Sequence, residues 1–192
     1  VLVADVLAGK HHLNPEVLER LAAAEGAGPI RLISNLPYAV ATPVVMNLLE
    51  SGLPVGEGLV TVQKEIAERW CARPGSAKYG APSVSVQLLC IPETIRVVPP
   101  EVFWPAPRVH SAVVRLRPRP EARPDAAYRR TAAWVRAAFA QRRKALPRRI
   151  AAITELGVDE AEVVRRLAAL GKPPDTRPEQ LSAGEFARLA QS

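Results

Sequence analysis

The chain has 192 residues and a mass of 20.8 kDa, with 48% hydrophobic and 23% charged residues. This composition is enough for a hydrophobic core without disulfides or metals, and no apolar run approaches the roughly 18 residues that a membrane span requires. Lysine and arginine outnumber aspartate and glutamate by 26 to 19, and the net charge of +7 favours a polyanionic partner. Most of this charge is arginine, a bias that a GC-rich genome would also produce.

The cysteines and the first residues set expectations about cellular context. Two cysteines, Cys71 and Cys90, cannot form a disulfide framework or a zinc cluster, and no charged-then-apolar leader opens the chain. We therefore expect a cytoplasmic protein without a metal site. Residues 1–5 have the pattern of a strand, and the only methionine is Met46, so the sequence is expected to be a fragment.

The first part of the chain mixes the patterns of strands and helices. Short runs rich in valine and isoleucine predict strands at residues 30–33, 59–62, 84–91, 95–98 and 109–116. Helical stretches such as residues 15–24 and 43–49 alternate with the first of these runs, an order that favours an α/β sheet. The last three runs leave no room for a helix between them, so we expect the sheet to end in an antiparallel pair.

A proline-rich segment divides the chain. Seven prolines fall between residues 99 and 124, and residues 117–125 have no apolar periodicity, which is typical of an extended linker. We predict a first domain over residues 1–118, a linker over residues 119–125 and a helical domain over residues 126–192.

The predicted helical domain has clear helix signals. Apolar spacing predicts helices near residues 132–139, 147–156 and 159–170. A fourth helix is expected to begin at Ser182, because Ser182 with Glu185 three residues later forms a capping box.

The positive charge is concentrated in this second part. Residues 125–192 carry a net charge of +5 and residues 1–124 only +2, and no acidic residue stands between residues 129 and 149. A stretch of one sign favours a phosphate-contacting surface, although it could also be a solubilising face. The candidate RNA-binding residues are Arg136, Arg142, Arg143, Lys144, Arg148 and Arg149.

The segment Asn35-Leu-Pro-Tyr38 directly follows an apolar strand. In open α/β sheets, ligands bind at the carboxyl ends of strands. A lone asparagine here would be a turn former, but an amide oxygen, a proline-stiffened carbonyl and an aromatic ring together suit the exocyclic amine of a flat heterocycle. Two acceptors on the hydrogens of such an amine would favour its pyramidal, nucleophilic form, so positioning would replace a strong base.

This motif and three others resemble the ribosomal RNA adenine dimethyltransferases of the KsgA type. The others are Gln63-Lys-Glu65, Phe103-Trp-Pro-Ala-Pro-Arg-Val-His-Ser-Ala-Val-Val-Arg-Leu116 and Phe139-Ala-Gln-Arg-Arg-Lys-Ala-Leu146. The resemblance covers nearly the whole chain. It implies a Rossmann-like class I methyltransferase domain that depends on S-adenosylmethionine and is N-terminally incomplete here, followed by a small all-helical domain.

The resemblance also implies an activity and its catalytic residues. The expected reaction is the dimethylation of adenine N6 in small-subunit ribosomal RNA, by a monomer that binds the small ribosomal subunit and no membrane. Asn35 and the carbonyl of Pro37 would hold the target N6, while Tyr38 and Phe103 would pack on the target base. From the residues alone, Tyr38 and Phe103 could instead be core aromatics.

The cofactor residues implied by the resemblance are Asp5, Val6 and Asn35. Asp5 would receive the adenine amine of S-adenosylmethionine, although an aspartate here could also cap a helix. The family's Gly-x-Gly-x-Gly loop is absent from the chain; in the family it precedes the segment that matches residues 1–7. Three positions depart from the family pattern without removing a catalytic group, namely Ala106 for proline, Arg108 for lysine and His110 for aspartate.

Other functions remain open at this stage. A large-subunit RNA adenine methyltransferase of the antibiotic-resistance type would share the chemistry, although Leu36 within the motif and the basic helix favour the small-subunit type. A DNA adenine methyltransferase is disfavoured because nothing resembles a target-recognition domain. A non-catalytic RNA-binding or ribosome-assembly module would keep the basic surface and lose the reaction.

Overall fold

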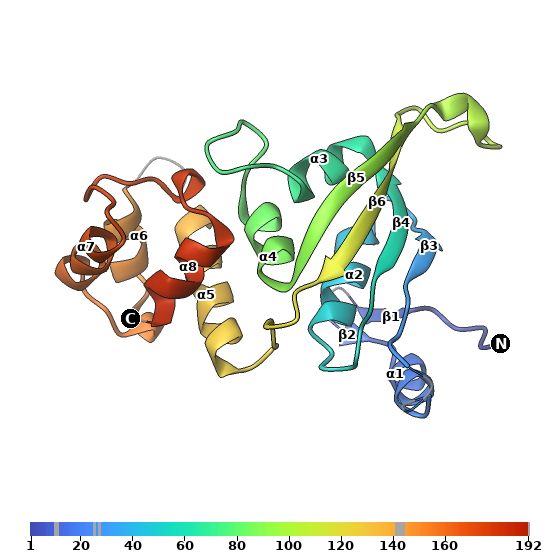
Figure 1. The fold of residues 1–192 in the computed structure, drawn as a ribbon, viewed down its shortest axis with the longest axis horizontal. Coiled ribbons are helices and arrows are strands. Elements are labelled where there is room, and N and C mark those ends of the chain that lie inside the picture. The colour runs from blue at the N-terminus through green and yellow to red at the C-terminus, as the bar shows by residue number, and fades with distance from the viewer. Residues whose placement is uncertain (10–11, 25, 27, 141–144, 192) are drawn as a thin grey trace. The chain divides into compact units, whose positions relative to one another are not determined.

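A computed structural model of the chain describes residues 1–9, 12–24, 26, 28–140 and 145–191 (Figure 1). It divides into two compact units, one of residues Val1–Cys71 with Leu89–Arg123 and one of Ala72–Leu88 with Pro124–Ser192. The boundary between Arg123 and Pro124 lies inside the predicted linker. Residues Ala72–Leu88 differ from the predicted division, because they belong to the helical unit rather than to a domain over residues 1–118.

The first unit contains a sheet of four strands in the order β3-β4-β6-β5, side by side in Figure 1. Their bounds are β3 (Ile33–Asn35), β4 (Gly58–Gln63), β5 (Cys90–Val98) and β6 (Ser111–Pro118). β3 and β4 are parallel, whereas β6 is antiparallel to both β4 and β5. The predicted antiparallel pair at the end of the sheet is therefore confirmed. A separate two-stranded sheet joins β1 (Leu7–Gly9) to β2 (His12–Leu13).

Two strand predictions were wrong, and a third was displaced, because β3 spans Ile33–Asn35 and not residues 30–33. Residues 81–89 form helix α4 (Ala81–Leu89), so most of the strand predicted over residues 84–91 is helical, and β5 begins only at Cys90. A continuous apolar run is compatible with a buried helix as well as with a buried strand. At the start of α4, the Ser83 hydroxyl accepts a hydrogen bond from the Gly80 amide at 3.0 Å. Residues 1–5 form no strand.

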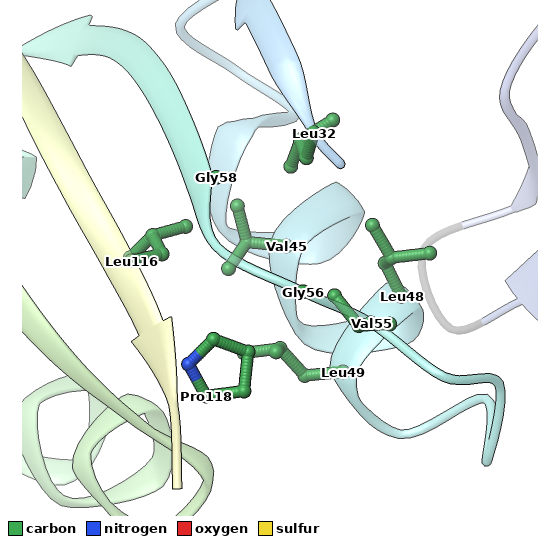
Figure 2. Close-up of a pocket in the computed structure, with 9 residues that line it drawn as sticks. All are labelled: Leu32, Val45, Leu48, Leu49, Val55, Gly56, Gly58, Leu116 and Pro118. Atoms are coloured by element: carbon green, nitrogen blue, oxygen red, sulfur yellow. The ribbon is translucent and has the colours of Figure 1, made fainter. Parts of the chain in front are cut away.

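The sheet buries one face. The buried face includes the even-numbered residues Val60 and Val62 of β4 and Val114 and Leu116 of β6. Helix α2 (Ala41–Leu49) packs its apolar side against this face, and Figure 2 shows Val45 beside Leu116 around an apolar cavity of about 10 Å³. The side chains that line this gap are apolar, so it is part of the core. This unit also contains the α-helices α1 (Pro15–Ala22) and α3 (Lys64–Trp70).

Glycine at position 58 allows β4 to begin close to the strand beside it. A Cβ atom there would lie 3.0 Å from the backbone oxygen of Leu32 and 3.3 Å from its Cβ. Both atoms belong to the backbone or its first side-chain carbon, so they cannot swing aside. A side chain at position 58 would therefore crowd the chain just before β3, whose parallel pairing with β4 carries Asn35 at its end.

The second unit is built from helices around one core. Its helices include α5 (Ala126–Ala140), α6 (Leu146–Ala151), α7 (Glu160–Ala169) and α8 (Ala183–Gln191), together with most of α4. Trp134, Leu146, Leu167 and Phe186 are fully buried in this core, and Val84 of α4 joins them. This apolar contact explains why α4 belongs to the helical unit. Within the part of the chain that the structure describes, no helix has the length and apolar character needed to cross a membrane.

Helix α8 begins with the predicted capping box. The backbone amide of Ser182 donates to the Glu185 carboxylate at 2.7 Å, and the Glu185 amide donates to the Ser182 hydroxyl at 3.2 Å. Burial raises the pKa of Glu185, but hydrogen bonds from Lys172 and Ser182 outweigh it, so the pKa lies below its ordinary value. The fourth predicted helix is confirmed with its start signal.

Candidate functional site

Four residues predicted to act on the target base line one open hollow. Its volume is about 320 Å³, near the lower end of the range of small-molecule pockets. The lining residues are Asn35, Leu36, Pro37, Tyr38, Phe103, Trp104, Pro105 and Pro107. They come from the end of β3 and from the connection between β5 and β6, segments more than sixty residues apart in sequence.

Asn35 is the last residue of β3, so its side chain stands at the carboxyl end of a parallel strand. The Leu36 amide that follows donates to the Thr61 carbonyl of β4 at 3.1 Å, and the Leu36 side chain is buried. These contacts fix Leu36, and Asn35 itself stands in register with Thr61 of β4. The amide of Asn35 is therefore presented to the hollow from a rigid sheet edge.

The carbonyl of Pro37 accepts a hydrogen bond from the Val40 amide at 3.1 Å. A carbonyl oxygen has two lone pairs, so this bond leaves room for a second donor such as an amine hydrogen. The turn also fixes the direction of the carbonyl. The predicted role of Pro37 is compatible with this geometry.

Tyr38 and Phe103 are both half-buried and line the hollow, so neither is the core aromatic that the sequence left open. The Tyr38 hydroxyl shares a hydrogen bond of 2.8 Å with the hydroxyl of Ser111, which is fully buried at the first residue of β6. Ser111 also stands in register with Gln63 of β4. The Tyr38 ring is thus held at its far end by the sheet while its face stays available to the hollow.

The bond between Tyr38 and Ser111 leads to a testable coupling. We expect Tyr38→Phe and Ser111→Ala each to lower the free energy of unfolding by about 1 kcal/mol, because each change leaves the other hydroxyl without its partner. The double variant should lose much less than the sum of the two. Urea denaturation of the four proteins measures this, and strictly additive losses would show that the bond does not form in solution.

The predicted cofactor residues Asp5 and Val6 are not among the lining residues of the hollow. Asp5 is exposed, and its carboxylate accepts a hydrogen bond from the Leu7 amide at 3.1 Å. Helix α1 is capped by Asn14, whose side chain accepts from the Glu16 amide at 3.0 Å. The alternative that Asp5 caps a helix is therefore wrong, and its assignment to the cofactor stays a prediction.

The predicted RNA-binding residues that the structure describes, Arg136, Arg148 and Arg149, are not all on the surface. Arg136 on α5 and Arg148 on α6 are exposed, and Arg148 lies 3.4 Å from the Glu160 carboxylate of α7. The stretch of residues 129–149 contains no acidic residue, but the fold places the Glu160 carboxylate beside it. Arg149 is only 4% exposed, and its guanidinium donates to the Ala138 carbonyl near the end of α5.

This burial removes Arg149 from the predicted phosphate-contacting surface. Its guanidinium lies instead at the carboxyl end of α5, where a positive charge is favourable. Burial is also the main cause that lowers the pKa of Arg149 below its ordinary value. The other predicted residues, Arg142, Arg143 and Lys144, lie outside the described residues.

Sequence reasoning gave no role to two residues at this site. Trp104 lines the hollow, and Ser111 holds Tyr38. Both stand inside the segment of residues 103–116 that carries the family resemblance. Their place in that segment was the only signal available, because a contact between Ser111 and Tyr38 spans 73 residues of sequence.

The sheet and its site together define the class of protein. A mixed sheet that ends in an antiparallel pair, with Asn35-Leu-Pro-Tyr38 at the end of β3, agrees with the amino-methyltransferase class that the sequence resemblance implies. Comparison with known proteins narrows the class. The profile described as ribosomal RNA adenine dimethylase matches residues 6–182, so the chain belongs to this family.

Individual relatives agree with the family. The chain is 42% identical over 171 residues to the ribosomal RNA small subunit methyltransferase A of Kineococcus radiotolerans, which covers 89% of this chain and 56% of that protein. The chain spans between 56% and 65% of the length of the first curated relatives that it matches.

Two solved structures share the fold. One is a dimethyladenosine transferase from Plasmodium falciparum, with a TM-score of 0.71, 23% identity, and coverage of 83% of this chain and 65% of that one. The other is the 23S rRNA methyltransferase ErmE, with a TM-score of 0.65, 21% identity, and coverage of 90% and 68%. The likeness confirms the methyltransferase fold and does not distinguish the two ribosomal subunits.

Proposed function

We propose that this chain provides the adenine-binding site and an RNA-binding part of an enzyme that dimethylates adenine N6 in small-subunit ribosomal RNA. The observation that carries the proposal is the meeting of Asn35, Pro37, Tyr38 and Phe103 at one hollow. Two acceptors and two aromatic rings are the groups that a flat base with an exocyclic amine requires. The relatives named for the small subunit favour that RNA over large-subunit RNA.

The proposed residues act by position. In the first transfer, the side-chain oxygen of Asn35 and the carbonyl of Pro37 accept the two hydrogens of N6, which turns the nitrogen lone pair out of conjugation with the ring. Each transfer forms one N6–carbon bond and releases one N6 proton, so the monomethylated amine offers one hydrogen to the same two acceptors in the second transfer. Tyr38 and Phe103 hold the plane of the base, and the bond to Ser111 keeps the Tyr38 ring in place. The base must leave its stack to reach this site, so an unpaired adenine is the expected substrate.

The proposed methyl donor is S-adenosylmethionine, which supplies an electrophilic methyl group on a good leaving group. Two features of the described residues fit it. Asp5 offers an exposed carboxylate that can accept from an adenine amine, and Asn35 offers an amide at the hollow. Asp5, Val6 and Asn35 are therefore the proposed cofactor residues of this chain.

The proposed RNA contacts lie in the helical unit. Arg136 and Arg148 are exposed there, and Arg142, Arg143 and Lys144 are added from the sequence. Each cation that neutralises a phosphate releases counterions, so binding should weaken steeply as salt rises. The proposal is that these residues hold the small-subunit RNA while the hollow receives one adenine.

A direct assay tests the proposed function. The full-length protein is incubated with S-adenosylmethionine and with small or large ribosomal subunits that lack adenine methylation, and the RNA nucleosides are analysed by mass spectrometry. We expect N6,N6-dimethyladenosine in small-subunit RNA. Dimethyladenosine in large-subunit RNA alone would replace the proposal with the antibiotic-resistance type, and RNA binding without any methylation would leave a non-catalytic module.

A further inference from the structure

Trp104 is the most exposed of the chain's three tryptophans. Its side chain is 98% exposed, whereas Trp70 and Trp134 are fully buried. A bare indole exposes a large apolar area to water, which costs free energy unless the ring has a partner. Because Trp104 lines the hollow that holds Asn35, its exposure points to a ligand of that site.

The segment that carries Trp104 is stiff. It connects β5 to β6, and Figure 1 shows it projecting past the ends of the neighbouring strands. Prolines stand at positions 99, 100, 105 and 107, and a short 3₁₀ helix, Pro100–Val102, is closed by a 3.1 Å bond from the Phe103 amide to the Pro100 carbonyl. Prolines restrict the backbone, so little further entropy is lost when a ligand packs on this ring.

The three aromatic residues at the hollow differ in depth. Tyr38 and Phe103 are half-buried, and they are the residues proposed to hold the target adenine. Trp104, almost fully exposed, forms the outer rim. A flat ligand that covers Trp104 therefore lies outside the position of the target base, where the next nucleotide of the same strand would be.

We infer that Trp104 is a stacking platform for the nucleobase beside the target adenine, an inference that rests on the proposed function. Taking the adenine out of its stack exposes the face of its neighbour, and stacking on Trp104 covers that face again. Stacking of this kind accepts any base, since every base has a π-face. Arg108, exposed on the same connection, can contact a backbone phosphate.

The fluorescence of Trp104 gives a test that needs no methyl donor. The probe is an unstructured oligoribonucleotide of about ten nucleotides containing one adenine, added to the full-length protein. Trp104 is the exposed tryptophan of this chain, so iodide should quench its emission in the free protein. We expect the RNA to quench that emission itself and to protect the remainder from iodide.

Affinity measurements complete the test. Trp104→Ala should weaken binding of the oligoribonucleotide about tenfold or more, while Trp104→Phe should keep most of the affinity because it keeps a stacking face. Val102→Ala is the matched control, since Val102 is 62% exposed on the same connection but does not line the hollow. An unchanged melting temperature checks that the variants fold.

Two results would overturn the inference. One is Trp104→Ala binding the RNA as tightly as the unaltered protein, and the other is RNA binding without any change in the iodide-accessible emission. Neither result depends on catalysis. If Trp104 proves not to stack on RNA but small-subunit RNA is still methylated, the proposed function stands. Failure of the proposed function would be seen separately, as the absence of dimethyladenosine in the nucleoside analysis.

Discussion

Asn35→Ala in the full-length protein is expected to reduce methyl transfer to small-subunit RNA by about 10²–10³-fold in kcat. The side-chain oxygen of Asn35 is the acceptor that would favour the reactive form of N6, and it is presented from the end of β3 by a fixed backbone. None of the described residues that line the hollow carries a carboxylate, imidazole or amine that could act in its place. Single-turnover methylation with small subunits measures the rate of this step.

The controls separate chemistry from folding and binding. Asn47→Ala removes another asparagine of the same unit, one whose side chain donates to the Pro43 carbonyl in α2, and should leave the rate constant near that of the unaltered protein. Affinity for RNA should change little in Asn35→Ala, because the basic residues of the helical unit are intact. A rate constant for Asn35→Ala within a few-fold of the unaltered value would contradict the catalytic assignment.

The sequence predicted the sheet best where local patterns were unambiguous. In β4 and β6, buried residues alternate with partly or fully exposed ones along most of each strand, and the predicted positions are within two residues of the observed ones. The strand predicted over residues 84–91 was wrong because local sequence does not decide whether such an apolar run joins a sheet or a helical core. Tertiary contacts decide it. Val84 belongs to the same buried core as Trp134, fifty residues later, and no local signal encodes that placement.

The candidate site was predictable in part for a similar reason. Asn35 and Tyr38 sit in one short motif, and Phe103 came from the family resemblance, so their meeting at one hollow could be expected. The contacts that hold the site in place could not be predicted. The bond from Tyr38 to Ser111 and the exposure of Trp104 arise from how β6 and its preceding connection are placed, which only the folded chain determines.

The basic stretch shows the limit of counting charges along a sequence. Arg136 and Arg149 belong to the same acid-free segment, yet one is exposed and the other buried. Arg149 follows Pro147 in the short helix α6, and neighbouring Leu146 and Ile150 are fully buried, so its side chain enters the core with them. Among the described residues, its Nε and Nη2 atoms have no hydrogen-bond partner.

This difference leads to opposite expectations for the two arginines. We expect Arg149→Ala to lower the free energy of unfolding by about 2–4 kcal/mol, because it leaves a cavity and deprives the Ala138 carbonyl of its donor. Arg149→Met, which keeps the volume of the stem, should cost less, since it also removes a buried charge that is only partly hydrogen-bonded. Denaturant titration of the full-length variants measures both losses.

Arg136→Ala should instead leave the free energy of unfolding within about 0.5 kcal/mol and weaken RNA binding, since its side chain is exposed on α5. The slope of the logarithm of the binding constant against the logarithm of salt concentration should fall by about 1, the amount expected for one lost phosphate contact. Folded Arg149→Ala should keep the slope of the unaltered protein, because a buried guanidinium releases no counterion. A reduced slope in folded Arg149→Ala would return that residue to the RNA-binding surface, and an unchanged slope in Arg136→Ala would remove α5 from it.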